Sequence, residues 1–174
     1  LKFDIPIDNT NLLGILKNEL PIASCTVVWK KKCFEHIRFI EKLQYAEEWE
    51  CYSRIISSNF KGISIKNILY YNRKHKNSNT GEFYNDNPIR RKSKSDAILY
   101  VVKNLNSKKL LSKPILRYLI SISYNFKDFN LFDKIIDNIT ISNTEKLKWR
   151  FFYLFLPYRL TLYKLKLKIV NNSK

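Results

Sequence analysis

The spacing of apolar residues changes character near residue 95, and this change most constrains the fold. Before it, apolar residues come in short runs that include β-branched types, such as the run at 22–30, and such runs are typical of strands. After it, apolar residues recur at helical spacing over long stretches. The sequence therefore predicts an α+β region over residues 1–94, followed by an α-helical region over residues 95–174.

Individual elements follow from the same patterns. The first region is expected to hold helices at 10–19 and 46–59 and strands at 22–30 and 63–70, with a turn and short helix between residues 31 and 43. Residues 71–95 are polar and basic, which indicates a solvated loop. The helices expected after that loop lie at 95–104, 107–125, 128–139 and 143–168.

The segment 46–59 has the clearest helical pattern. Its apolar positions form a single stripe, made of Trp49, Tyr52, Ile55 and Ile56. Glu50 and Arg54 are four residues apart in the favourable order, which predicts an exposed ion pair along the helix. Gly62 follows close to the expected end of the helix.

The chain is strongly basic, with a formal net charge of +17 over 174 residues. Such a charge suits nucleic acid, anionic lipid or phosphorylated substrates as partners. An alternative is compositional bias, because Lys, Asn, Ile, Phe and Tyr are all abundant together. The charge total alone therefore does not locate a site.

The cysteines and the apolar runs indicate the compartment. Cys25, Cys33 and Cys51 are odd in number and form no Cys-x-x-Cys pair, so neither a disulfide framework nor a zinc site is predicted. The longest apolar stretch, at 149–163, is interrupted by charged residues and is too short for a membrane-spanning helix. With no leader peptide visible, we expect a cytoplasmic protein, with peripheral attachment to the inner face of the membrane as a further expectation.

Two motifs carry a specific hypothesis. The first is Glu47-Glu48-Trp49 at the start of the expected helix, with Arg54 downstream. The second follows the next expected strand and consists of Tyr71, Arg73, His75 and Ser78. In order and spacing the pair resembles the family 2 glycosyltransferases, over roughly residues 20–80 of this chain. In that family an acidic pair and an aromatic residue open a helix, and a Tyr-x-Arg-x-His-x-x-Ser loop comes after a strand.

The resemblance implies the acceptor-side half of an α/β nucleotide-sugar transferase domain over residues 1–94, with 95–174 as a basic helical tail. The implied activity is inverting transfer of a sugar from a nucleotide-sugar donor to a glycan or lipid-linked acceptor, in polysaccharide biosynthesis. Glu48 would be the catalytic base and Glu47 a supporting acid. Trp49 and Arg54 would lie near the acceptor.

The second motif would serve the leaving group. Arg73 and His75 would bind the diphosphate, since cations neutralise the charge that develops there. His75 would also coordinate a divalent metal, Mg²⁺ or Mn²⁺. Family members more often carry Asp at the position of Glu48.

A carboxylate base is physically reasonable at Glu48. General-base catalysis requires an ionised group that takes the acceptor's proton, and the first turn of a helix stabilises an anion. The plainer interpretation is that Glu47 and Glu48 are surface acids, that Trp49 belongs to the core and that His75 is solvated.

The nucleotide-binding half of such an enzyme is not recognisable in this sequence. No Asp-x-Asp metal motif occurs, and no opening parallel-sheet pattern is seen. The chain alone is therefore expected to be inactive, with activity belonging to a longer parent protein. Two other functions compete: a basic nucleic-acid-binding module around residues 71–94, and a membrane-surface adaptor built from the aromatic and basic run at 149–159.

Overall fold

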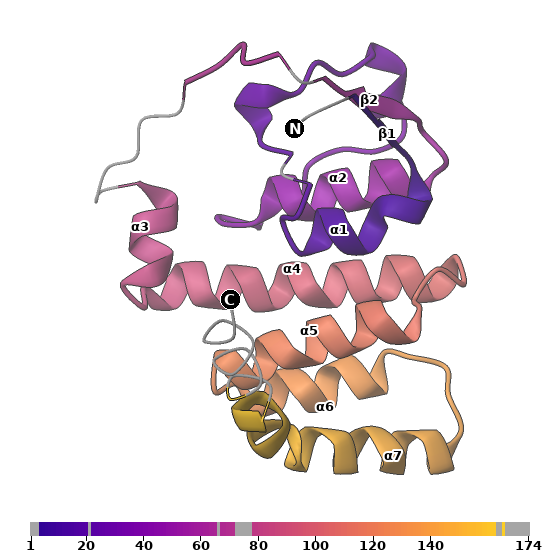
Figure 1. Cartoon of the computed structure of the whole chain (residues 1–174), viewed down its shortest axis with the longest axis vertical. Helices are drawn as coiled ribbons and strands as arrows, with labels where there is room; N and C mark the ends of the chain where they lie inside the picture. Colours follow the sequence, from indigo (N-terminus) through magenta and orange to yellow (C-terminus); the bar gives the residue numbers. More distant parts are fainter. Residues whose placement is uncertain (1–3, 21, 66, 72–77, 163–164, 166–174) are drawn as a thin grey trace. The chain divides into compact units, whose positions relative to one another are not determined.

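The computed structural model describes residues 4–20, 22–65, 67–71, 78–162 and 165 (Figure 1). It is 62% helical and contains one small sheet of two strands. This confirms an α+β chain that is rich in helix. Among the described residues, no helix has the length and apolar character needed to cross a membrane.

The chain divides into two compact units, Leu1–Tyr118 and Leu119–Lys174. The expected domain boundary at 94/95 falls inside a single continuous helix, α4 (Pro88–Ser107). The observed division instead lies within helix α5 (Lys113–Asn125).

The sheet of the first unit joins residues near its beginning to residues after the second helix. Strand β1 (Ile5–Ile7) pairs antiparallel with β2 (Gly62–Ser64), with Ile5 opposite Ser64 and Ile7 opposite Gly62. Only three residues of each strand pair. The predicted strand at 63–70 is therefore right only at its start, because β1 offers a partner no further than Ser64.

Helices α1 (Leu12–Leu16) and α2 (Glu47–Ser57) both lie between these strands in the sequence. The prediction of a helix at 46–59 is confirmed by α2. Helix α1 is shorter than the predicted 10–19, and a 3₁₀ turn at Asn9–Asn11 precedes it. Asp8 caps that turn, since its carboxylate accepts from the Thr10 backbone N–H at 2.8 Å.

The predicted strand at 22–30 is wrong. A 3₁₀ turn occupies Ser24–Thr26, and another follows at Lys31–Phe34. Val27 has extended backbone angles, yet this segment has no ladder partner among the described residues, and the side chain of Val28 is fully exposed. Extended backbone becomes a strand only where a neighbouring strand accepts its hydrogen bonds, and β-branched composition alone does not supply one.

The predicted loop at 71–95 is wrong over much of its length, because helices α3 (Asn79–Tyr84) and α4 begin inside it. Side-chain caps start both helices. The Ser78 hydroxyl accepts from the Gly81 N–H at 3.0 Å, and the Asn87 side chain accepts from the Ile89 N–H at 3.0 Å. Pro88 then occupies the first turn of α4, where its missing N–H is harmless.

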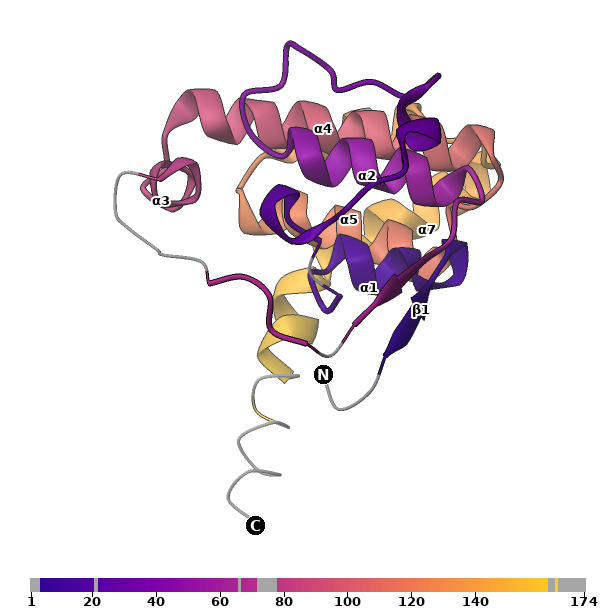
Figure 2. The same ribbon diagram turned by 90° about the horizontal axis from the view of Figure 1, so that it is seen from above.

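The core of the first unit forms where α2 meets α1 and α4 (Figures 1 and 2). Each helix contributes one apolar face to it. The fully or almost fully buried residues include Leu12, Ile15 and Leu16 from α1, Tyr52, Ile55 and Ile56 from α2, and Ile98, Val101, Val102 and Leu105 from α4. Tyr52 and Ile55 also form a cluster with Cys33 and Cys51, against which partly buried residues pack: Ile22, Trp29, Phe34, Ile37 and Phe60.

The second unit consists of helices. It holds the end of α5, α6 (Phe129–Asp137), α7 (Asn143–Leu154) and a further helical stretch at 156–162. Its buried residues include Leu119, Ile120, Leu131, Phe132, Ile135, Ile136, Tyr153 and Leu156. The prediction of helix without strand after residue 95 is confirmed for the described residues.

A buried serine of α4 fixes the loop that leads into α2. The Ser93 hydroxyl accepts from the backbone N–H groups of Gln44 and Tyr45, both at 2.9 Å, and donates to the Tyr45 carbonyl at 2.8 Å. Arg90, one turn earlier, donates to the Gln44 carbonyl. These bonds tie the backbone of Gln44 and Tyr45 to α4, and they set where α2 starts.

We therefore expect Ser93→Ala to lower the free energy of unfolding by about 1–3 kcal/mol, because it removes the three hydrogen bonds by which the buried Ser93 hydroxyl holds the backbone of Gln44 and Tyr45. Urea unfolding followed by circular dichroism measures this. Ser107→Ala is the matched control, since its hydroxyl is exposed and bonds only one turn back, to the Asn104 carbonyl. Equal stability of the two variants would contradict the role given to Ser93.

Candidate functional site

Helix α2 begins with three acidic residues in its first turn, Glu47, Glu48 and Glu50. The helix dipole and the unpaired N–H groups of this turn favour negative charge there. The residue before the helix, Ala46, has left-handed backbone angles (φ 65°, ψ 18°) and gives no side-chain cap. This conformation is unfavourable for alanine by about 1–2 kcal/mol, so the entry to the candidate site is a strained point of the backbone.

Glu48 is held by the segment that was expected to be a strand. Its Oε2 accepts a hydrogen bond from the Ser24 backbone N–H at 3.1 Å. The turn that presents Ser24 is closed by Thr26, whose hydroxyl accepts from the Ala23 N–H at 3.2 Å and whose N–H donates to the Ala23 carbonyl at 2.9 Å. The half-buried Glu48 carboxylate is thereby fixed in position at the N-terminus of α2.

The residue before the second motif lies near the turn that holds Glu48. Interaction with the Cys25 thiol raises the pKa of Tyr70, which places these two side chains close together. Tyr52, one turn along α2, also has a raised pKa, chiefly through burial and further through the nearby charge of Glu48. We call these residues the Glu48 cluster: Ser24, Cys25, Glu48, Tyr52 and Tyr70.

Sequence reasoning missed most of this cluster. Ser24 acts through its backbone N–H, which carries no side-chain signal in a sequence. Tyr70 stands directly before the second motif, in the segment predicted to be a strand. Cys25 is an exposed free thiol, and its lack of a cysteine partner pointed to no function.

The expected residues of the second motif are placed only in part. Arg73 and His75 lie outside the described residues. Tyr71 is exposed, and Ser78 serves as the N-cap of α3. Within the described ranges, no group of three or more His, Cys, Asp or Glu side chains gathers as a metal site would require. The described residues therefore do not provide the expected Mg²⁺ or Mn²⁺ site.

Trp49 ties three helices together. Its indole N–H donates to the Leu16 carbonyl at the end of α1, at 3.0 Å. The ammonium of Lys94, on α4, lies 3.5 Å from the centre of its ring system. Burial lowers the pKa of Lys94 from 10.5 to about 7. Trp49 thus occupies a structural position, with Lys94 over its ring.

Arg54 belongs to a buried ion pair. Its Nε and Nη2 donate to the two carboxylate oxygens of Glu50 at 2.6 and 2.8 Å, and Nη2 also donates to the Arg38 carbonyl at 2.6 Å. The Glu50 side chain is 0% exposed. The pairing predicted from the i,i+4 spacing is confirmed, but the prediction that the pair is exposed is wrong. The apolar stripe of α2 is broad enough to bury Glu50 along with it.

We expect Glu50→Gln to lower the free energy of unfolding by roughly 3 kcal/mol, because it leaves the partly buried Arg54 guanidinium without its counter-charge. Chemical denaturation of both proteins measures this. Glu19→Gln is the control, since Glu19 pairs with Lys17 at an exposed position where such pairs contribute under about 1 kcal/mol. A loss for Glu50→Gln no larger than that of Glu19→Gln would contradict the buried pair.

Lys94 makes stability depend on pH. The pKa of Lys94 is about 7 in the folded chain and has the ordinary value of 10.5 in the unfolded chain. Between pH 7 and pH 10.5 the unfolded chain therefore binds more protons than the folded chain. Stability from this group therefore rises as pH increases from about 7 towards 10.5 and is constant below that window. Unfolding at about pH 7 and about pH 8.5 should show a gain on the order of 1 kcal/mol that Lys94→Met lacks. The same pH dependence in both proteins would contradict the lowered pKa.

Comparisons with models of protein families, with curated proteins and with solved structures found no match to this chain. What it does has therefore to be argued from its own residues. The described residues offer Glu48, in the first turn of α2, with its carboxylate hydrogen-bonded to the Ser24 N–H.

Proposed function

We propose that this chain forms the acceptor-side half of an inverting nucleotide-sugar glycosyltransferase, of the family 2 kind, with Glu48 as its general base. The supporting observation is that Glu48 sits in the first turn of α2, bonded to Ser24, with Tyr70 reaching the same turn through Cys25. Tyr70 directly precedes the second motif, so its proximity to this turn supports a site built from both motifs.

The chemistry needs one proton acceptor at a fixed place. The acceptor hydroxyl attacks the anomeric carbon of the donor sugar, the carbon–oxygen bond to the nucleoside diphosphate breaks, and the diphosphate leaves with the electron pair. Glu48 takes the hydroxyl proton as the new bond forms. Attack from the face opposite the leaving group inverts the anomeric carbon.

The surroundings of Glu48 suit this role. The helix N-terminus favours its ionised form, and the Ser24 N–H fixes Oε2, while a carboxylate has a second oxygen that can accept a hydroxyl proton. Rigid elements position such a group more precisely than a free loop does. The buried Glu50–Arg54 pair, one turn further on, keeps this end of α2 in place.

The proposal gives the other expected residues supporting roles. Glu47 contributes negative charge beside Glu48. Trp49 braces α2 against Leu16, and Arg54 positions the helix through Glu50. Arg73 and His75 would bind the diphosphate and, through His75, a divalent metal. The acceptor would be a glycan or a lipid-linked sugar at the cytoplasmic face.

Donor binding is assigned to polypeptide beyond these 174 residues. The described chain has no parallel sheet on which a nucleotide would lie. The extended backbone around Val27, with Val28 fully exposed, is where a strand from such a half could pair. This unpaired segment supports the finer proposal that the first unit completes an α/β transferase domain.

The test replaces Glu48 by glutamine, which keeps size and polarity but accepts no proton. The tagged chain is isolated from its source cell with whatever polypeptide accompanies it, and transfer of labelled sugar from a pool of nucleotide-sugars is measured. Glu48→Gln should lower transfer by roughly 10²-fold or more, the usual contribution of a general base. Nucleotide-sugar binding should hardly change.

Glu41→Gln is the control, because Glu41 is exposed in a loop and is no part of the site. Glu50→Gln would be a poor control, since the buried pair makes it destabilising. Thermal melts accompany each assay. Unchanged transfer by a folded Glu48→Gln protein, or absence of any transfer by the isolated wild-type assembly, would overturn the proposal.

A further inference from the structure

The second unit leaves one face of its last helices uncovered. The side chains on this face are large and apolar, with exposed fractions of 50% or more. They are Leu147, Phe151 and Leu154 on α7, and Phe155, Tyr158, Leu162 and Leu165 beyond it. We call these residues the outer stripe. The opposite face of the same segment faces the core of the unit, where Tyr153 and Leu156 are buried.

The stripe is bordered by cations on α7. With 3.6 residues per turn, Leu147, Phe151 and Leu154 fall within an arc of about 60°. Lys148 and Arg150 lie about 40–60° to either side of that arc. Both are exposed. An apolar stripe between flanking basic residues is typical of a helix that lies in a membrane interface.

The segment from α7 onward is strongly basic. Residues 143–174 contain eight Lys or Arg and one acidic residue, Glu145 in the first turn of α7. An anionic partner is therefore favoured, since cations far outnumber acids in this segment. A basic partner, or a second copy presenting the same segment, would meet like charges along its length.

The apolar residues of the stripe distinguish between two anionic partners, nucleic acid and a lipid bilayer. Nucleic acid is bound through phosphate contacts and through aromatic stacking on bases, and the aliphatic Leu147, Leu154 and Leu162 provide neither. A bilayer accepts leucine and phenylalanine at its headgroup boundary and holds lysine and arginine at its surface.

We propose that the outer stripe docks on the surface of an anionic lipid bilayer, with α7 lying parallel to the membrane plane. The unit need not open to do so. Tyr153, on the inner face, stacks on Phe132 of α6 with 4.1 Å between ring centroids, and this holds α7 in place while its outer face remains exposed. The proposal stands on the second unit alone and does not depend on the chemistry at Glu48.

Flotation of the full chain with vesicles tests the proposal. One set of vesicles is phosphatidylcholine alone, and the other contains about 30% phosphatidylserine. The chain should float with the anionic vesicles and much less with the neutral ones. Lys148→Gln with Arg150→Gln should lower the partition coefficient by about 30-fold, as expected for two cations at an anionic surface. Phe151→Gln with Leu154→Gln should lower it by at least tenfold.

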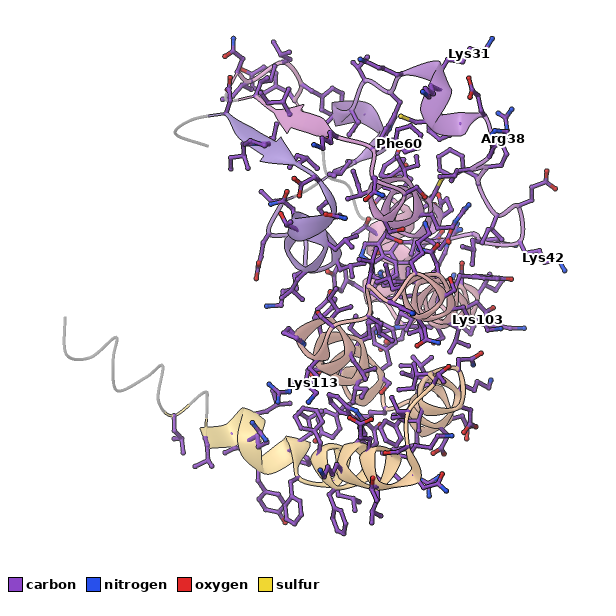
Figure 3. The ribbon with its side chains drawn as sticks, turned by 90° about the vertical axis from the view of Figure 1, so that its right-hand side faces the viewer. Lys31, Arg38, Lys42, Phe60, Lys103 and Lys113 are labelled. Atoms are coloured by element: carbon purple, nitrogen blue, oxygen red, sulfur yellow. The ribbon has the colours of Figure 1, made fainter. Side chains whose placement is uncertain are left out.

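The control variants remove positive charge or exposed apolar surface from positions outside the outer stripe. Lys103→Gln with Lys113→Gln removes the same net charge from exposed positions on α4 and α5 (Figure 3), and Tyr84→Gln with Ile89→Gln removes exposed apolar surface from the first unit. Both should float like the wild type. Circular dichroism confirms folding, and Leu147→Gln with Tyr158→Gln is a second stripe variant should the first misfold.

Each remaining outcome overturns the proposal. Failure of the wild type to float with anionic vesicles would do so, as would an equal loss for the Lys103 and Lys113 control. Displacement from vesicles by single-stranded RNA, with affinity for RNA unaffected by the Phe151 and Leu154 changes, would identify a nucleic-acid surface. Dimerisation in sedimentation that these changes abolish, without flotation, would show that a second copy covers the stripe.

Discussion

The arrangement of the first unit depends on the burial of helix α2 together with the charge that it carries inside. Glu50 is fully buried, and its carboxylate accepts from Nε and Nη2 of Arg54, while Nη2 also donates to the Arg38 carbonyl. A buried carboxylate is tolerated only when it is paired and hydrogen-bonded in this way. The bond to Arg38 ties the pair to the chain outside α2. Burial of the face that carries Glu50 then favours one rotation of α2 about its axis, and that rotation determines which residues face α1, α4 and the Ser24 turn.

The position of Glu48 follows from that rotation. Two residues before Glu50, it faces the Ser24 turn, while Trp49 faces α1 and Lys94 of α4. At the other end of α2, Ser57 and Ser58 accept from the Lys108 ammonium at 3.0 and 2.7 Å. A candidate catalytic carboxylate is thus carried by a helix held at both ends, which is the kind of support that precise chemistry needs.

Sequence patterns predicted the helices better than the strands, for a physical reason. A helix such as α2 satisfies its own backbone, so the stripe of Trp49, Tyr52 and Ile55 was enough to find it. A strand needs a partner that its own residues do not reveal, so 22–30 was assigned wrongly and only the start of 63–70 correctly. Ser78 and Asn87, the caps of α3 and α4, are typical N-cap residues. They lie in a polar, basic segment whose composition is also typical of a loop. For the candidate site, the sequence predicts the acidic residues at the start of α2, whereas the contacts of Ser24 and Cys25 are seen only in the fold.

The central claim is that α2 is a rigid support that holds Glu48 against the Ser24 turn. Amide hydrogen exchange, followed residue by residue by nuclear magnetic resonance, measures this most directly. Amides of α2 from Cys51 to Ser57 should exchange only through global unfolding of the first unit, and the Ser24 amide, bonded to Glu48, should exchange more slowly than an unstructured amide. Exchange of α2 as fast as that of the short α3, or a Ser24 amide as fast as an unstructured one, would contradict the claim.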